Sequence, residues 1–462
     1  MQPKPLTRED CRNYIEQHLF EPVGASHTGE SVGQPGHIGL ELEAIPYRIN
    51  AQKGVETVMH SGGEGSLLDS LIHASENCGG VVRYLDQIIQ GEQQRLVGAI
   101  EFPDGSKFQF EPGGQIEIAT APCDSLGKVF TQLNAKQQIL KLLTEQHGIH
   151  FGYFGTNPWF NVQEIGLQIN KPRFRALAAY FDGINAFGRQ MMLQTCSLQV
   201  NLDLGKGEDT RLKRIMASNL LAPFAAALFA NSPITAGRVN GYKSYRSHIW
   251  QQLDNSRTGL LPIDRLSKRL NKKEFVDSYL DFALKAPIIY IENFGDEVFP
   301  SNITLAHWLV HPIKGISPTL THLENHLSLL FPEVRFKGYL ELRSADAPPP
   351  DWQMIPALFY AGLLYSPPQL DKTLDLLLPY ASQLSKLRKS ATQGMESEEI
   401  FIISKSLIRL AIDGLSNLPS SFKSENNTKE LIAFFEEFTL KRKSFADKQL
   451  NIFSTDKLLI FN

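Results

Sequence analysis

The segment HIGLELEAIPYRI, residues 37–49, alternates apolar and polar side chains along most of its length. Successive side chains of a β-strand point to opposite faces, so this alternation predicts a strand. Glu41 and Glu43 then share one face, while the apolar residues between and beside them occupy the other. This strand therefore presents two neighbouring carboxylates on one face.

Three further predicted strands carry polar residues two positions apart. A single pair of this kind is also what a sheet with one solvated face and one packed face presents. The four pairs together are dominated by carboxylates and amides, and clustered carboxylates repel one another unless cations bind them. If the four strands lie in one sheet, they line one surface with acidic groups. The three additional pairs are Gln115 and Glu117, Gln199 and Asn201, and Glu341 and Arg343.

Magnesium suits such a surface because it takes oxygen ligands and commonly joins protein carboxylates to substrate phosphates. The faces carry no His or Cys, which disfavours zinc. Basic residues supply the complementary charge, and guanidinium groups bind phosphate and carboxylate in a two-pronged manner. Carboxylates for a metal and arginines for phosphate together indicate phosphoryl transfer. The basic residues in question are Arg238, Arg246, Arg257, Arg335, Lys337 and Arg343.

Composition excludes several other classes of protein. The chain has 462 residues, 42% of them hydrophobic, and a net charge of −3, so it lacks the positive field that a nucleic-acid partner would require. No apolar run is long enough to span a membrane. The four cysteines form no CxxC pair, so neither a zinc ribbon nor a thioredoxin-type motif is present, and so few thiols in a long chain favour a reducing compartment. The start MQPKPLTRED has no apolar stretch, so we expect a cytoplasmic protein.

The distribution of elements predicts an α+β protein with an antiparallel sheet and one polar active-site face. Residues 95–119 are expected to form a hairpin and residues 335–343 a strand; residues 125–147, 172–193 and 210–230 are expected to be helical. Nearly everything after Pro348–Pro350 has helical spacing. We therefore expect a catalytic portion, 1–350, and a mostly helical portion, 351–462, that can pack on the same domain. The sequence specifies no oligomeric state.

Six segments, spread in order over about 300 residues, carry a resemblance to a known family. The pattern resembles the plant-type glutamate–cysteine ligases, which belong to the glutamine synthetase-like carboxylate–amine ligases. The resemblance implies that ATP phosphorylates the γ-carboxylate of L-glutamate and that the amine of L-cysteine then displaces phosphate. The segments are GLELEAIPY (39–47), FEPGGQIEIATAP (110–122), TCSLQVNLD (195–203), FANSP (229–233), YRSHIW with a following D and RTG (245–259), and KGYLELRSAD (337–346).

The resemblance also implies roles for particular residues. The metal ligands are expected to be Glu41, Glu43, Glu111, Glu117, Gln199 and Glu341. The catalytic residues are expected to be Arg343, Glu341, Arg246 and Arg257, with Arg343 facing the transferred phosphoryl group. Contacts to ATP are expected from Lys337, Arg335, Gln115 and Asn201.

The sequence departs from the family pattern at Cys196, at Leu198 and in APPPDW after Ala345-Asp346. These departures leave open a γ-glutamyl ligase that uses another amine acceptor. A non-catalytic subunit that binds nucleotide or glutamate is the third hypothesis, which the retained carboxylates disfavour. The product could serve glutathione or ergothioneine synthesis.

Overall fold

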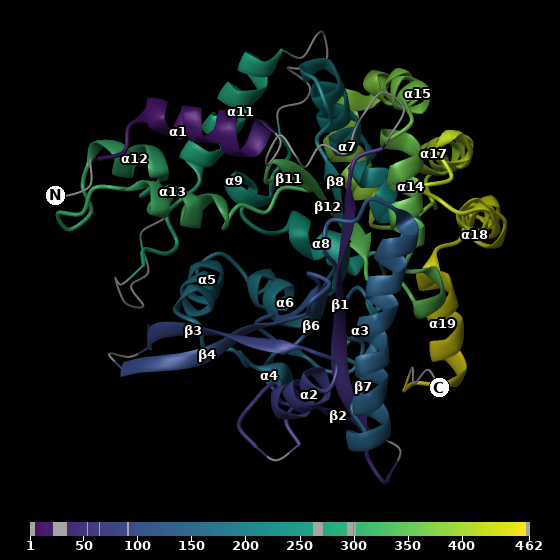
Figure 1. The fold of residues 1–462 in the computed structure, drawn as a ribbon, viewed down its shortest axis with the longest axis horizontal. Helices are drawn as coiled ribbons and strands as arrows, with labels where there is room; N and C mark the ends of the chain where they lie inside the picture. The colour runs from purple at the N-terminus through teal and green to yellow at the C-terminus, as the bar shows by residue number, and fades with distance from the viewer. Residues whose placement is uncertain are drawn as a thin grey trace.

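An antiparallel β-sheet forms the centre of the molecule (Figure 1). The structure is a computed structural model, and it describes residues 5–21, 35–52, 54–63, 65–89, 92–261, 271–292, 299 and 302–458. The main path of the sheet runs β11-β12-β8-β1-β6-β5-β4-β3, and β2 and β7 also pair with β1. The bounds of these strands are β1 Ile38–Ile49, β2 Val55–Thr57, β3 Val81–Ile89, β4 Glu92–Glu101, β5 Lys107–Phe110, β6 Ile116–Ala119, β7 His150–Gly152, β8 Ser197–Asp203, β11 Val334–Phe336 and β12 Tyr339–Asp346.

Strand β1 lies between β6 and β8, and its alternation decides which face of the sheet is packed. Leu40 and Leu42 are fully buried in the main hydrophobic core, whereas Glu41 and Glu43 point to the other face. The packed face is covered by α3 (Leu126–His147), α7 (Glu208–Leu228) and α14 (Ile355–Leu364), which contact β1, β12 and β8 respectively. The fold class expected from the sequence, α+β with an antiparallel sheet, is confirmed.

The polar face of the sheet is covered by a different group of helices. Helices α5 (Pro172–Asp182), α6 (Phe187–Gln194) and α8 (Tyr245–Gln251) lie on the opposite side of β1 from α3 and α14 (Figure 1). A long hairpin of β3 and β4 extends from the sheet on this side (Figure 1). Side chains from α5, α6 and α8 therefore face the polar side of the sheet across a cavity.

The helices that follow Pro350 belong to the same hydrophobic core as the sheet. Helices α15 (Pro367–Leu377) and α17 (Glu398–Asn417) both pack on α7, and α17 also packs on α14. We propose that the C-terminal portion, of which the structure describes residues 351–458, packs on the sheet within one domain.

The remaining helices are short or peripheral. In the described parts of the chain, none combines the length and the apolarity that a membrane crossing requires. Two further strands, β9 (Ile234–Thr235) and β10 (Arg238–Val239), form a separate ribbon. The helices are α1 Arg8–Tyr14, η1 Ile15–Phe20, α2 Leu67–Glu76, α4 Val162–Ile165, α9 Asn255–Thr258, α11 Lys272–Lys285, α12 Leu305–Val310, α13 Leu320–Leu327, η2 Pro350–Trp352, η3 Leu378–Gln383, α16 Leu384–Ala391, α18 Glu425–Glu437, η4 Thr439–Lys441 and α19 Phe445–Thr455.

Three predicted elements are divided in the structure. The strand expected at 335–343 is a hairpin, because Gly338 has a φ of 72° and turns the chain between β11 and β12. The helix expected at 172–193 is interrupted after Asp182, where Gly183 caps α5. The hairpin expected at 95–119 has three strands, because a turn after Glu111 separates β5 from β6. The first of these differences matters for the site, because the turn brings Arg335 directly opposite Glu341.

Candidate active site

The four strands with paired polar residues are adjacent in the sheet, in the order β12-β8-β1-β6. Their registers place Glu43 opposite Glu117 and Glu41 opposite Gln199. Asn201 likewise lies opposite Glu341. Side chains that are paired in an antiparallel register lie on the same face of the sheet, so one polar surface joins all four strands.

This surface forms the floor of a cavity of about 610 Å³. Helices α5 and α6 contribute apolar side chains to its wall, and Trp250 of α8 and Phe331 add aromatic rings. This volume lies within the range of ordinary ligand pockets, so the cavity can hold more than one small substrate.

Three carboxylates in this cavity form a compact cluster. One oxygen from each of Glu43, Glu111 and Glu117 lies within 4.8 Å of the others. Glu111 reaches the cluster because a tight turn follows it, in which Gly114 has a φ of 85° and donates its N–H to the Glu111 carbonyl at 2.9 Å. A Cβ on Gly114 would lie 2.5 Å from the Gln168 side chain, so the EPGGQ motif requires glycine here.

The three carboxyl groups have raised pKa values, chiefly because burial disfavours their charged forms. Burial, together with the nearby Glu111 carboxylate, raises the pKa of Glu43 to about 7. Burial raises the pKa of Glu111, and burial with the surrounding carboxylates raises the pKa of Glu117 well above its usual range. A divalent cation would relieve this repulsion, and an all-oxygen donor set fits Mg²⁺. The donor chemistry and the raised pKa values thus fit a metal at this cluster.

Glu341 has different surroundings from the carboxylate cluster. It is fully buried and makes ion pairs with Arg335 at 2.6 Å, Lys337 at 2.6 Å and Arg343 at 2.8 Å. Burial by itself would raise its pKa, but these three cations hold that pKa well below its usual range. Glu341 is therefore arranged to orient the three cations, which line the same cavity.

The other two predicted metal ligands engage neighbouring side chains. The Gln199 amide oxygen accepts a hydrogen bond from Arg343 at 2.7 Å, and its nitrogen lies 3.4 Å from Glu43. Glu41 accepts a hydrogen bond from the Asn201 amide nitrogen at 3.0 Å. Both residues line the cavity beside the cluster.

Asn201 lies at a second cavity of about 330 Å³ on the same face of the sheet. The two cavities share Glu41, Lys107 and Tyr339 as lining residues, so they are neighbours. The side-chain amide oxygen of Asn201 is buried and has no hydrogen-bond partner. Because a buried acceptor without a partner is costly, this oxygen is available to accept a hydrogen bond from a ligand in the second cavity.

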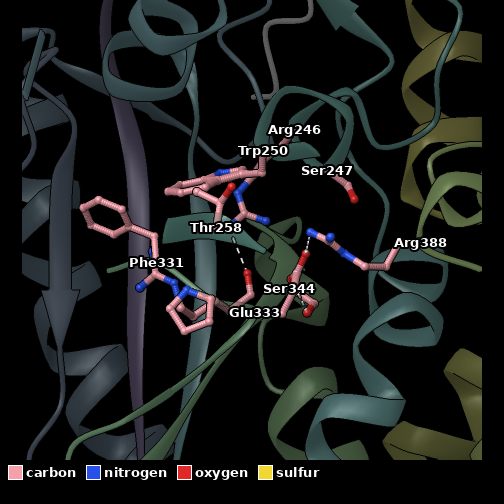
Figure 2. Close-up of a pocket in the computed structure, with 10 residues that line it drawn as sticks. Arg246, Ser247, Trp250, Thr258, Phe331, Glu333, Ser344 and Arg388 are labelled. Carbon is pink, nitrogen blue, oxygen red and sulfur yellow. Dashed lines mark hydrogen bonds and ion pairs between the residues drawn. The ribbon is translucent and has the colours of Figure 1, made fainter. Parts of the chain in front are cut away.

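Arg246 lies beside the main cavity rather than on its wall. It lines a small adjoining space of about 20 Å³, together with Trp250 and Arg343, which also line the main cavity (Figure 2). Its guanidinium donates to the Arg343 carbonyl at 2.8 Å. Gln115 is at the main cavity, but its amide is occupied by backbone groups of Gly113 and Thr195, at 3.0 and 3.1 Å.

Arg257 does not lie with the other predicted residues. Its fully buried guanidinium donates to the backbone carbonyls of Leu329, at 2.8 Å, and Pro287, and it lines none of the three cavities described here. The structure therefore does not bring Arg257 to the cavity with the other predicted residues: its two terminal nitrogens join α9 to neighbouring loops.

Sequence reasoning missed two cations of the cavity wall, Lys171 and Arg173. Both lie at the start of α5, and both act electrostatically on Glu111. A signal was present in the sequence, since Lys171-Pro-Arg173 places positive charge at a helix N-terminus, where the helix dipole disfavours it.

Two of the three departures from the family pattern, Cys196 and Leu198, line none of the cavities. Cys196 and Leu198 are fully buried in the main hydrophobic core, on the packed side of the sheet. Neither places a side chain in the cavity, so neither gives a structural reason to expect another amine acceptor.

Comparisons with known proteins agree with the class that this site suggests, a carboxylate–amine ligase. The family model of glutamate–cysteine ligase family 2 matches residues 69–429. The chloroplastic glutamate–cysteine ligase of Solanum lycopersicum is 34% identical over 423 residues, which cover 89% of this chain and 74% of that protein. The corresponding protein of Arabidopsis thaliana is 30% identical over the same shares. The chain belongs to glutamate–cysteine ligase family 2.

Among solved structures, a glutamate–cysteine ligase from Francisella tularensis in complex with AMP overlaps with a TM-score of 0.49 and 12% identity, covering 92% of this chain and 86% of that one. Membership of the family implies the use of ATP and of a divalent metal ion.

The expectation of a cytoplasmic protein is contradicted by the relatives, since those from tomato, Brassica juncea and Arabidopsis are all named chloroplastic. A low cysteine content fits any reducing compartment and therefore does not select the cytoplasm.

Proposed function

We propose that this protein is an ATP- and magnesium-dependent glutamate–cysteine ligase that produces γ-glutamylcysteine. One observation carries the proposal. The cluster of Glu43, Glu111 and Glu117 shares a single cavity with the cations of Arg335, Lys337 and Arg343. Metal ligands facing phosphate-binding groups are the arrangement that phosphoryl transfer needs.

The reaction has two covalent steps. An oxygen of the glutamate γ-carboxylate attacks the γ-phosphorus of ATP, and ADP leaves with the electrons of the broken P–O bond. The cysteine amine nitrogen then attacks the acyl carbon of γ-glutamyl phosphate, phosphate leaves, and the nitrogen loses a proton. The product would supply low-molecular-weight thiol synthesis, of glutathione or ergothioneine.

Magnesium would be held by Glu43, Glu111 and Glu117, with Glu41 and Gln199 next to them. When bound, the ion would neutralise these carboxylates and polarise phosphate oxygens.

The cations on the floor of the cavity have the task of aligning ATP. Glu341 pairs with Arg335, Lys337 and Arg343. These three side chains are therefore ordered before ATP binds, which lowers the entropy cost of binding it. We assign Arg343 to the transferred phosphoryl group, because Gln199 and Glu341 fix its guanidinium beside the carboxylate cluster. Arg335 and Lys337 would then contact the other phosphates.

The second cavity would receive the nucleoside part of ATP. Its lining is mixed, with the apolar groups of Ile38 and Pro122 and the unpartnered oxygen of Asn201. An exocyclic amine or a ribose hydroxyl could donate to that oxygen. The phosphates would then lie in the main cavity and the nucleoside in the second cavity, with Glu41 and Tyr339 at the boundary between the two.

The amino-acid substrates would bind towards the roof. We assign Arg246 and the small space beside it to the glutamate α-carboxylate, since that space has room for about one water-sized group such as a carboxylate oxygen. Lys171 and Arg173 would offset the remaining negative charge of the substrates. Trp250, Phe331 and the α6 methionines would limit water, which would otherwise hydrolyse an acyl phosphate.

The test is ADP release from ATP, Mg²⁺ and glutamate, with and without cysteine, with mass analysis of the product. We expect ADP that depends on both amino acids, and γ-glutamylcysteine as product. Glu117→Gln should abolish turnover, whereas Glu101→Gln, an exposed carboxylate on β4, should not. Release that is indifferent to cysteine would reject the acceptor, and the absence of ADP with any amine would reject the ligase.

A further inference from the structure

Asp346, the last residue of β12, is a fully buried carboxylate that lines none of the three cavities described here. One of its oxygens accepts hydrogen bonds from the Asn231 N–H at 2.8 Å and the Ser232 hydroxyl at 2.7 Å. The other accepts from the Ser244 hydroxyl at 3.0 Å. The Arg246 guanidinium completes the surroundings at 3.7 Å.

The backbone at Gly155 packs directly against the Asp346 carboxyl group, which leaves no room for a water molecule between them. A Cβ on Gly155 would lie 2.5 Å from the Asp346 carboxyl group. Burying a charge is expensive unless hydrogen bonds and an opposite charge compensate for it. A buried aspartate that is so fully compensated, but that touches no cavity, calls for a role inside the protein.

The bonds from Asp346 lead to the first turn of α8 by two routes through serine hydroxyls, one to the backbone N–H of Arg246 and one to that of Ser247. The Ser232 hydroxyl, which donates to Asp346, accepts the Arg246 N–H at 3.1 Å. The Ser244 hydroxyl, which also donates to Asp346, caps the N-terminus of α8 by accepting the Ser247 N–H at 3.2 Å. Asp346 therefore fixes the first turn of the helix that carries both Arg246 and Trp250.

The far end of the Arg246 side chain is held to the same strand. Its guanidinium donates to the carbonyl of Arg343, three residues before Asp346 on β12. Figure 2 shows the Arg246 and Trp250 side chains next to each other, facing the small space bounded by Glu333 and Ser344. The aspartate and the strand carbonyl thus hold this arginine from two sides.

We propose that Asp346 is a positioning residue that holds Arg246, and with it the roof of the cavity, in the orientation that binds glutamate. The proposal rests on the assignment of Arg246 to the glutamate α-carboxylate made above. It joins three of the segments that carry the family resemblance, FANSP, YRSHIW and ELRSAD, into one unit around a single buried charge.

The test compares Asp346→Asn with wild type in two measurements on the full chain, steady-state kinetics and glutamate binding by calorimetry. Asparagine keeps the size but removes the charge and turns one acceptor into a donor. From the usual strength of hydrogen bonds to charged groups, we expect the KM and Kd for glutamate to rise about 10-fold or more, with the KM for ATP changing less than about 2-fold. An equal rise in both KM values, or no change in glutamate affinity, would overturn the proposal.

A double-mutant cycle separates positioning from general destabilisation. If Asp346 acts through Arg246, Asp346→Asn should cost less than about 2-fold in glutamate affinity once Arg246→Lys is present, because coupled residues are not additive. Independent, multiplicative effects would contradict the proposal. The matched control is Asp447→Asn on α19, which breaks an ion pair with Lys243 at 2.7 Å and touches neither residue. It should lower thermal stability and leave glutamate affinity unchanged.

Two further variants cover the case in which Asp346→Asn does not fold. Ser232→Ala and Ser244→Ala each remove one of the two routes, and each should raise the glutamate Kd about 3- to 10-fold. Unchanged affinity in both would reject the positioning role. Calorimetry measures glutamate binding without turnover. If the wild-type protein binds glutamate but makes no product, the proposed ligase function is rejected, and the binding data still test the role of Asp346.

Discussion

Replacing Glu43 with Gln should make the metal-free protein more stable and at the same time remove its response to magnesium. The pKa of Glu43 rises from 4.5 to about 7 on folding, because the carboxylate is buried and faces Glu111. A raised carboxyl pKa means that the folded state holds a proton which the unfolded state has released. Stability is therefore fully present below pH 4.5 and is lost as pH rises towards 7.

The size of the effect follows from the shift. Each pKa unit corresponds to about 1.4 kcal/mol, so the ionised Glu43 costs the folded state roughly 3 kcal/mol near pH 8 and about half of that near pH 5.5. Unfolding entropy of about 2.1 cal/mol/K per residue gives roughly 1 kcal/mol/K for a chain of this length. Glu43→Gln should thus raise the Tm of the metal-free protein by about 3 °C near pH 8, and by less near pH 5.5.

The assay is thermal unfolding in chelator and in increasing Mg²⁺, at both pH values. A ligand that binds only the folded state stabilises it by RT ln(1 + c/Kd), where c is the free ligand concentration, so the stabilisation grows with the logarithm of that concentration above Kd. We expect magnesium to stabilise the wild type near pH 8 and to have a much smaller effect on the variant. Glu101→Gln, which alters an exposed carboxylate paired with Arg83 at 2.6 Å, should reproduce neither change. A variant no more stable than wild type in chelator, or equally stabilised by magnesium, would refute the reasoning.

Other positions give separate expectations. Glu341→Gln should cost about 3–5 kcal/mol in denaturant unfolding, because it leaves buried Arg335 without its partner; a loss below 1 kcal/mol would show that solvent reaches this group. Gly114→Ala should lower activity at least about 10-fold and stability by about 1–3 kcal/mol, measured by kinetics and unfolding, because the turn needs a positive φ. Arg257→Lys should lower the Tm while leaving the KM values of the folded enzyme unchanged, and a selective rise in one KM would restore a substrate role.

The polar face could be predicted from sequence because it depends on a local rule. Side chains two apart on a strand share a face, so the pairs at Glu41 and Glu43 or Gln199 and Asn201 needed no knowledge of the fold. That the four strands would be neighbours was an assumption, and the registers bear it out.

The remaining features depend on turns and tertiary contacts, which the alternation of residues along a strand does not reveal. The neutralisation of Glu341 needs the turn at Gly338 that returns Arg335 across from it. Lys171 joins the cavity only because α5 covers the sheet. Arginine is a residue type that often binds substrate carboxylates and phosphates, which suggested a substrate contact at Arg257. Only the tertiary structure shows that its guanidinium donates to loop carbonyls instead.

The order in which the chain is made has a consequence for the sheet. Glu43, Glu111 and Glu117 all lie in the first third of the sequence, whereas Arg335 and Arg343 lie in the last third. During synthesis from the N-terminus, β1 and β6 can pair long before β12 leaves the ribosome. The nascent sheet then carries its acidic cluster before the cations of the final strands have joined the same surface.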